Sequence, residues 1–113
     1  MPAAFDASRL EALRGTMTAE NFSRLVRLFA ADPALRPGLL DEAMRADDRG
    51  AVQAVAHAIR GLSGNMGAAA LASLAAEMEA DCQSIDRAAQ TAQFEAMLGQ
   101  AAAARAALDE MVG

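Results

Sequence analysis

The sequence predicts an all-α protein, namely an up-and-down antiparallel four-helix bundle with one or two additional short N-terminal helices. First, hydrophobic residues make up 54% of the chain, and they are mostly alanine, leucine and methionine, with no tryptophan or tyrosine. Such a composition favours helices over strands. Second, apolar residues recur at helical spacing, and third, the breaks between these segments are short. With 113 residues, a single domain spanning residues 1–113 is expected.

The first three predicted helices are short. One covers Ala7 to Arg14 and is closed at Gly15, since glycine commonly ends a helix. Thr18 can cap the second, which runs to about Ala31 and ends at Asp32-Pro33. The third helix is expected to turn Leu39, Leu40, Ala43 and Met44 toward the core.

Three longer helices follow. Asp47-Asp48 provides a break and a cap for the fourth, which reaches about Met66 before a tight reversal at Gly67, and Asp86 starts the sixth. The inward residues of the fifth are Leu71, Leu74, Met78, Cys82 and Ile85, and those of the sixth are Phe94, Met97, Leu98, Ala101, Leu108 and Met111. The third to sixth helices would close the bundle, and the first two would pack across it or extend it.

The single histidine lies on the fourth helix and points away from its apolar side. At about 100° per residue, one sector of this helix collects Val52, Val55, Ile59, Leu62 and Met66. His57 projects opposite that sector, and Gln53, Arg60, Gly61 and Gly64 project to the same side as the histidine. The imidazole is therefore expected to be available to a partner.

Two glycines beside the histidine are costly in a helix. An interior helical glycine destabilises by about 1 kcal/mol relative to alanine, yet Gly61 and Gly64 interrupt a chain that uses alanine almost everywhere else. We interpret them as lowering the surface so that another protein can approach the ring. Close packing between helices is the alternative interpretation.

Composition also limits the function classes. The net charge is −5, and no basic stripe with aromatic residues appears, so nucleic-acid binding is not expected. Cys82 is the one cysteine, which suits a reducing compartment and a small buried side chain. Neither a secretion signal nor an apolar run long enough for a membrane span is present. We expect a free-standing, cytoplasmic, monomeric protein.

Several chemistries lack the residues they need. One histidine, one cysteine and scattered acids form no recognisable metal site, so no metal or cofactor is expected. The acidic pairs, including Glu77 and Glu79, are expected to be solvated. Ser63 is six residues from His57, on another side of the helix, and no acid that would orient the histidine is evident. No nucleotide-binding loop is present, so phosphate would have to come from another protein.

Phosphoryl transfer is the chemistry that fits. A histidine side chain on a surface is mostly neutral and nucleophilic at pH 7, and Arg60, one turn from His57, can hold phosphoryl oxygens through charge-assisted hydrogen bonds.

The spacing around the histidine is similar to that of the histidine-containing phosphotransfer (HPt) domain family. After the histidine, that family has an apolar residue at the second place, lysine at the third, glycine at the fourth, serine at the sixth, and glycine and alanine at the tenth and eleventh. Those places here hold Ile59, Arg60, Gly61, Ser63, Gly67 and Ala68, and the match extends to Asp47-Asp48, Leu71, Leu74 and Glu79. Arg60 replaces the usual lysine, and Leu62 stands where a small serine is common.

The resemblance implies a phosphorelay intermediate of two-component signalling. His57 would accept a phosphoryl group from a receiver-domain aspartate and pass it to another receiver domain, in response regulators and hybrid histidine kinases. The protein would have no kinase or phosphatase activity of its own, and magnesium would be held by the receiver. Arg60 would stabilise the transferred charge, Gly61 and Gly64 would leave room for the partner, and Gln53 would hydrogen-bond nearby.

Two alternatives stay open at this point. The domain could be phosphorylated directly by a histidine kinase, in which case transfer would need no receiver. It could also be a non-catalytic helical adaptor with an incidental histidine, in which case a receiver would bind without labelling His57.

Overall fold

The computed structural model describes residues 8–32 and 38–112, and in these ranges all regular structure is helical. The helices are α1 (Ser8–Arg14), α2 (Ala19–Ala31), α3 (Gly38–Arg45), α4 (Arg49–Met66), α5 (Ala69–Asp81) and α6 (Arg87–Val112). The all-α prediction is confirmed.

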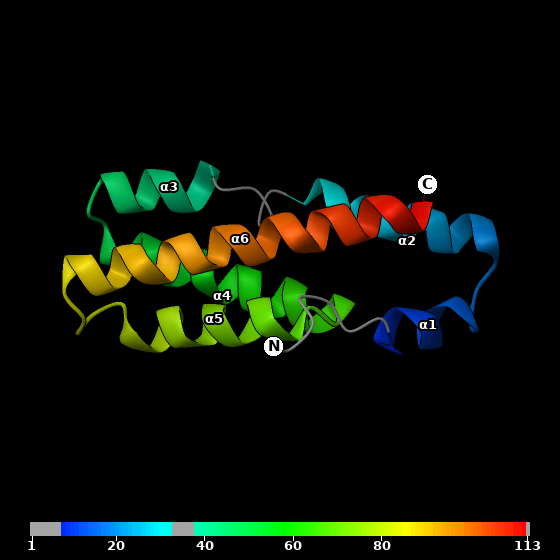
Figure 1. Ribbon diagram of the computed structural model, residues 1–113, viewed down its shortest axis with the longest axis horizontal. Coiled ribbons are helices and arrows are strands. Elements are labelled where there is room, and N and C mark those ends of the chain that lie inside the picture. The colour runs from blue at the N-terminus through cyan, green and yellow to red at the C-terminus, as the bar shows by residue number, and fades with distance from the viewer. Residues whose placement is uncertain (1–7, 33–37, 113) are drawn as a thin grey trace.

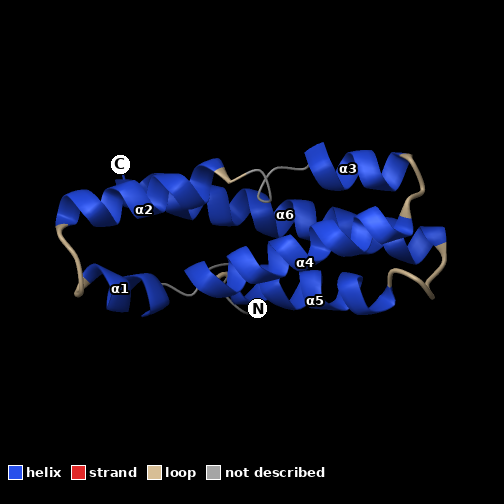
Figure 2. Ribbon diagram, turned by 180° about the vertical axis from the view of Figure 1, so that it is seen from behind, coloured by secondary structure: helices blue, strands red, loops and turns tan. Residues whose placement is uncertain are grey.

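The helices form an elongated bundle around α4, α5 and α6 (Figure 1). The chain reverses between α4 and α5 and again between α5 and α6, so that neighbouring long helices are antiparallel. α3 packs on α4, and α2 packs on α6. In both views α2 and α3 follow one another on the same side of α6 (Figure 2). This side of the bundle is therefore shared by two short helices, while α1 lies at one end.

Every described helix contributes apolar side chains to one core. Its fully enclosed members include Leu10 from α1, Val26 from α2, Val52 from α4 and Met78 from α5. Alanine supplies much of the rest of the core: Ala43, Ala56, Ala75, Ala101 and Ala104 are all buried. The helix that carries the histidine, α4, contributes Val52, Ala56, Ile59 and Met66 to this core.

The predicted short helices are largely confirmed. α1 ends at Arg14 as expected, and the Thr18 side chain accepts a hydrogen bond from the Asn21 backbone nitrogen at 3.1 Å, which caps α2. Ala7 and Pro33 lie outside the described residues. On α3 the prediction for Leu39 is wrong, because Leu39 is 50% exposed while Leu40 is buried. Leu39 is in the first turn of α3, on the side that no described helix covers.

The fifth helix is shorter than predicted. α5 ends at Asp81, so Cys82, which is buried, and Ile85, which is partly buried, lie in the connection that follows it and not in a helix. An arginine of α4 explains the turn, since Nη1 of Arg49 donates to the carbonyl oxygens of Cys82 at 2.6 Å and Ile85 at 2.8 Å. These contacts satisfy two carbonyl groups of the connection between α5 and α6.

The last helix begins where the sequence predicts. The Ala89 backbone nitrogen donates to the Asp86 carboxylate at 2.8 Å, which caps the first turn of α6. Met97, Ala101 and Leu108 are buried as expected, whereas Phe94, Leu98 and Met111 are partly buried. Of the helices in the described ranges, none is both long and apolar enough to cross a membrane.

Candidate functional site

The helix that carries His57 is fixed at both ends by local interactions. The Asp48 carboxylate accepts a hydrogen bond from the Ala51 backbone nitrogen at 3.0 Å, and its negative charge suits the positive end of α4. Gly67 ends the helix with φ of 85°, a left-handed conformation that glycine adopts without strain. α4 therefore starts and stops where the sequence predicts.

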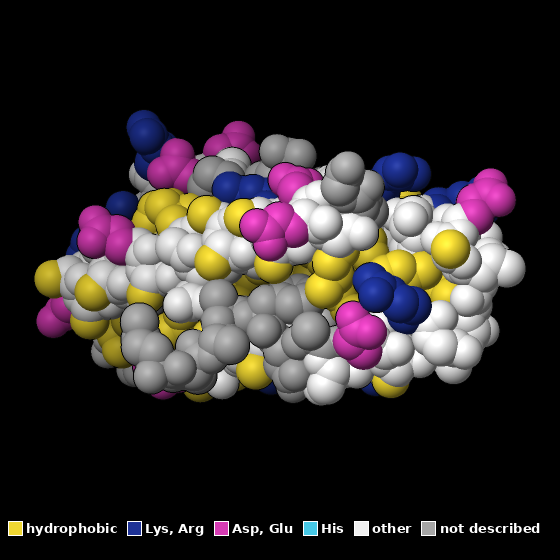
Figure 3. Space-filling model, turned by 45° about the vertical axis from the view of Figure 1, so that its right-hand side comes forward, with side chains coloured by type: hydrophobic (Ala, Val, Ile, Leu, Met, Phe, Trp, Pro, Cys, Tyr) yellow, Lys and Arg dark blue, Asp and Glu magenta, His cyan; other side chains and the backbone are white. Residues whose placement is uncertain are grey.

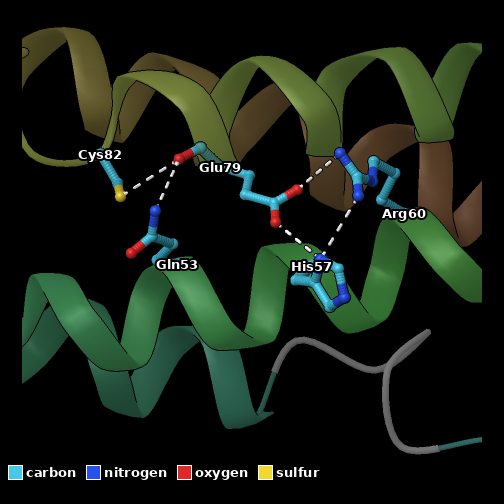
Figure 4. A network of polar contacts seen from close by, with 5 residues as sticks. All are labelled: Gln53, His57, Arg60, Glu79 and Cys82. Carbon is cyan, nitrogen blue, oxygen red and sulfur yellow. Dashed lines mark hydrogen bonds and ion pairs between the residues drawn. The ribbon is translucent and has the colours of Figure 1, made fainter.

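The projection of His57 away from the core is confirmed. Its side chain is 65% exposed, while Val52, Ile59 and Met66 on the opposite side of α4 are buried. No histidine is visible on the face shown in Figure 3. Figure 4 shows the ring beside the neighbouring helix α5.

One side of the imidazole is held by a carboxylate from α5. The Nδ1 atom of His57 lies 2.6 Å from the Oε2 atom of Glu79 (Figure 4). An ionised carboxylate only accepts hydrogen bonds, so this contact assigns the proton of the neutral ring to Nδ1. The lone pair then lies on Nε2, which points away from Glu79 in Figure 4.

Arg60 belongs to the same network. Its Nη1 atom is 2.9 Å from Oε1 of Glu79, and its Nη2 atom is 3.4 Å from Nδ1 of His57. The ion pair with Glu79 is short but is not aligned as a hydrogen bond, since Oε1 has no partner by hydrogen-bond geometry among the described residues. Arg60 is thus turned toward Glu79 and the Nδ1 edge of the ring.

Gln53 contacts the backbone of Glu79 and not the histidine. Its Nε2 atom is 3.4 Å from the Glu79 carbonyl oxygen, which the Cys82 thiol also approaches at 3.4 Å. This carbonyl lies in the last turn of α5, the negative end of that helix. Gln53 therefore connects the N-terminal part of α4 to the last turn of α5, which also carries the Glu79 carboxylate.

The two predicted glycines face open space. A Cβ atom at Gly61 or Gly64 would meet nothing within 4 Å among the described residues. Neither glycine is required for helix packing, which removes that alternative interpretation. Of the alanines beside the ring, Ala54 and Ala58 are exposed, but Ala56 is fully buried and cannot contribute to a surface.

Glu79 is the residue that the sequence analysis misjudged. The two acids of this segment differ: Glu77 is exposed, as expected, whereas the Glu79 side chain is only 18% exposed and contacts both His57 and Arg60. Its position in the sequence could have indicated this, because Glu79 lies four residues after the buried Ala75 and three before the buried Cys82, on the same side of the helix. The acid that orients the histidine is therefore present.

Ser63 does not take part in the site. Its side chain is fully buried, and its hydroxyl has no hydrogen-bond partner among the described residues. A buried hydroxyl on another side of α4 cannot act as a nucleophile beside His57, in agreement with the sequence analysis.

The comparisons with known proteins agree with this geometry. The sequence model of the Hpt domain family matches residues 7–111. The crystal structure of histidine-containing phosphotransfer protein B (HptB) from Pseudomonas aeruginosa PAO1 is similar to this chain, with a TM-score of 0.87 and 27% sequence identity, covering 99% of this chain and 96% of the other. No curated protein matches the sequence. The chain belongs to the Hpt domain family and serves as a histidine phosphotransfer intermediate of a two-component phosphorelay.

Proposed function

We propose that His57 is the phosphoacceptor of this domain and that Nε2 is the atom that carries the phosphoryl group. The observation that supports this most directly is the contact of 2.6 Å between Nδ1 and Glu79. It leaves Nε2 with the lone pair, on a ring that is 65% exposed. An exposed nucleophile whose ring is held in one tautomer suits repeated transfer between proteins.

In the transfer step Nε2 attacks the phosphorus of a receiver's aspartyl phosphate. The N–P bond forms, the P–O bond to the aspartate breaks, and its electron pair returns to the carboxylate. The proton on Nδ1 stays in place, and the Glu79 carboxylate offsets the positive charge that the ring gains. The reverse step delivers the phosphoryl group to a second receiver.

The other predicted residues support this step. Arg60 stabilises the transferred charge, and Gly61 and Gly64 leave room for a receiver's backbone to approach the ring. Gln53 holds the last turn of α5 through the Glu79 carbonyl. Residues 1–113 act as one domain, a monomer in the cytoplasm.

The partners are receiver domains of response regulators and hybrid histidine kinases. The receiver brings the aspartate and the magnesium ion, so this protein needs no cofactor and has no kinase or phosphatase activity of its own. No binding to nucleic acid or membrane is part of the proposed role.

The test is transfer of label from a phosphorylated receiver in the presence of magnesium. We expect wild-type protein to acquire an acid-labile label and His57→Gln to acquire none. Label that persists on His57→Gln would contradict the assignment of His57. The same assay with a histidine kinase alone, without any receiver, is expected to give no label, and rapid labelling there would show direct phosphorylation by the kinase.

A further inference from the structure

Three polar side chains of α4 contact the C-terminal end of α5 and the connection after it. Arg49, Gln53 and His57 follow one another at intervals of four residues, which places them on one side of α4. His57 contacts the Glu79 side chain at 2.6 Å, and Gln53 contacts the Glu79 carbonyl oxygen at 3.4 Å (Figure 4). Arg49 contacts the connection that follows α5. The segment that carries Glu79 is therefore held to α4 at successive points.

The contacts of Arg49 are shorter and less exposed than that of Gln53. Nη1 of Arg49 donates to the carbonyl oxygens of Cys82 at 2.6 Å and Ile85 at 2.8 Å, and both hydrogen bonds are partly buried. The hydrogen bond of Gln53 is exposed and has a length of 3.4 Å. Hydrogen bonds from a charged donor are the stronger ones, and partial burial strengthens them further. Arg49 therefore contributes more than Gln53 to the position of this segment.

The residue that Arg49 binds is coupled to the last turn of α5. The Cys82 backbone nitrogen donates to the Met78 carbonyl oxygen at 3.0 Å, and the Cys82 thiol approaches the Glu79 carbonyl oxygen at 3.4 Å. A shift of Cys82 would thus be passed to the turn that carries Glu79. The Glu79 carboxylate lies 2.6 Å from Nδ1 of His57, and such a hydrogen bond weakens steeply when its length or angle changes.

We propose that Arg49 is a positioning residue for phosphoryl transfer, which fixes the end of α5 so that the Glu79 carboxylate stays in contact with Nδ1 of His57. This inference rests on the proposed function of His57. Arg49 precedes His57 by eight residues on α4, about 12 Å along the helix axis, so it does not touch the reacting atoms. Its effect on transfer passes through Glu79, which sets the tautomer of the ring.

Arg49→Met tests this role, because methionine keeps an unbranched apolar side chain and removes the donors. The rate of label transfer from a phosphorylated receiver is measured together with the ¹⁵N chemical shifts of the ring nitrogens, on protein with the native circular dichroism signal. The matched control is Arg87→Met, since Arg87 forms an exposed ion pair of 3.1 Å with Asp47, close to the start of α4. Both substitutions are repeated in the Glu79→Ala background.

We expect Arg49→Met to slow transfer at least about threefold and to shift the ring nitrogens toward a mixture of the two tautomers. Arg87→Met should have the wild-type rate and shifts. In the Glu79→Ala background, Arg49→Met should change the rate by less than about twofold, because the group through which it acts is gone. A wild-type rate, wild-type ring shifts, or an equal slowing in the Glu79→Ala background would each overturn the proposal.

The ring shifts distinguish positioning from a purely structural role. If Arg49 only stabilised the fold, Arg49→Met would lower the free energy of unfolding and leave the ring nitrogens of the folded protein unchanged. If the variant loses its helical circular dichroism signal, sucrose, which favours the compact state, is added to all the proteins alike and the same criteria apply.

The outcome is also separable from that of the proposed function. Absence of label on wild type, or label on His57→Gln, would contradict His57 as the carrier. The role of Arg49 is judged only from proteins that retain His57, and the ring shifts are measured without any transfer.

Discussion

His57 and Glu79 are joined by a contact of 2.6 Å between Nδ1 and Oε2, across the interface of α4 and α5. The two residues are 22 positions apart in the chain, and the turn at Gly67 brings their helices together. One carboxylate thereby sets which ring nitrogen carries the proton and which is left to react. Our first prediction concerns this pair.

Glu79→Ala is expected to lower the rate of phosphoryl transfer by at least about tenfold, because the imidazole loses the group that fixes its tautomer. The rate should fall less in Glu79→Gln, because the amide oxygen of glutamine can still accept a hydrogen bond from Nδ1. Transfer from a phosphorylated receiver measures the rate, and ¹⁵N NMR of the ring nitrogens measures the tautomer. Glu77→Ala, an exposed acid on the same helix, is the control. Wild-type transfer by Glu79→Ala would contradict the prediction.

Substitution of a glycine beside the histidine is expected to raise the stability of the fold and to weaken binding of the receiver. Gly64→Leu is expected to leave the fold intact, since a Cβ there meets no described atom within 4 Å, and to stabilise α4 by up to about 1 kcal/mol. The same side chain should weaken receiver binding by obstructing its approach. Urea unfolding measures the free energy of unfolding, and a titration with the receiver measures the binding affinity.

Gly99→Leu is the matched control for that experiment. Gly99 lies on α6, and a Cβ there also meets nothing within 4 Å among the described residues. We expect a similar gain in stability with unchanged receiver affinity. Equal affinity of both variants would show that the surface at Gly64 does not contact the receiver.

Arg49 is expected to stabilise the connection between α5 and α6. Arg49→Ala removes hydrogen bonds to the carbonyl oxygens of Cys82 and Ile85 and should lower the free energy of unfolding by about 1–3 kcal/mol. Arg45→Ala breaks only an exposed ion pair on α3 and should cost less than about 0.5 kcal/mol. Urea unfolding distinguishes the two variants, and equal losses would refute the role of Arg49.

Gln90 is expected to lower the free energy of unfolding. Its side chain is buried, and both amide atoms lack a hydrogen-bond partner among the described residues. Gln90→Met keeps much of the volume and removes the unsatisfied polar groups, so the free energy of unfolding should rise by about 1 kcal/mol. A decrease of that size in urea unfolding would mean that the amide is satisfied in solution.

The helices themselves were predictable because their signals are local. Thr18 and Asp48 cap helices through contacts only three residues away, and Gly67 ends one through its own backbone conformation. Such interactions can be inferred from a short stretch of sequence. The exposed position of His57 was predictable for the same reason, since helical periodicity alone opposes it to Ile59.

The sequence-based predictions were wrong where the local structure depends on residues far away in the chain. The connection after Asp81 is held by Arg49, more than thirty positions earlier in the chain, which donates to the carbonyl oxygen of Cys82. Leu39 continues an apolar pattern, but no described helix covers its side of α3. Periodicity indicates that a face is apolar and cannot indicate which partner will cover it.

The sequence by itself determined an all-α chain, the helix that bears His57, and the side of that helix on which the ring lies. Only the tertiary structure decided what holds the ring, because Glu79 belongs to another helix, and its distance from His57 depends on how α4 and α5 pack. Helix formation is governed by neighbours a few residues apart, whereas the orientation of a reactive side chain depends on contacts that exist only after the helices have come together.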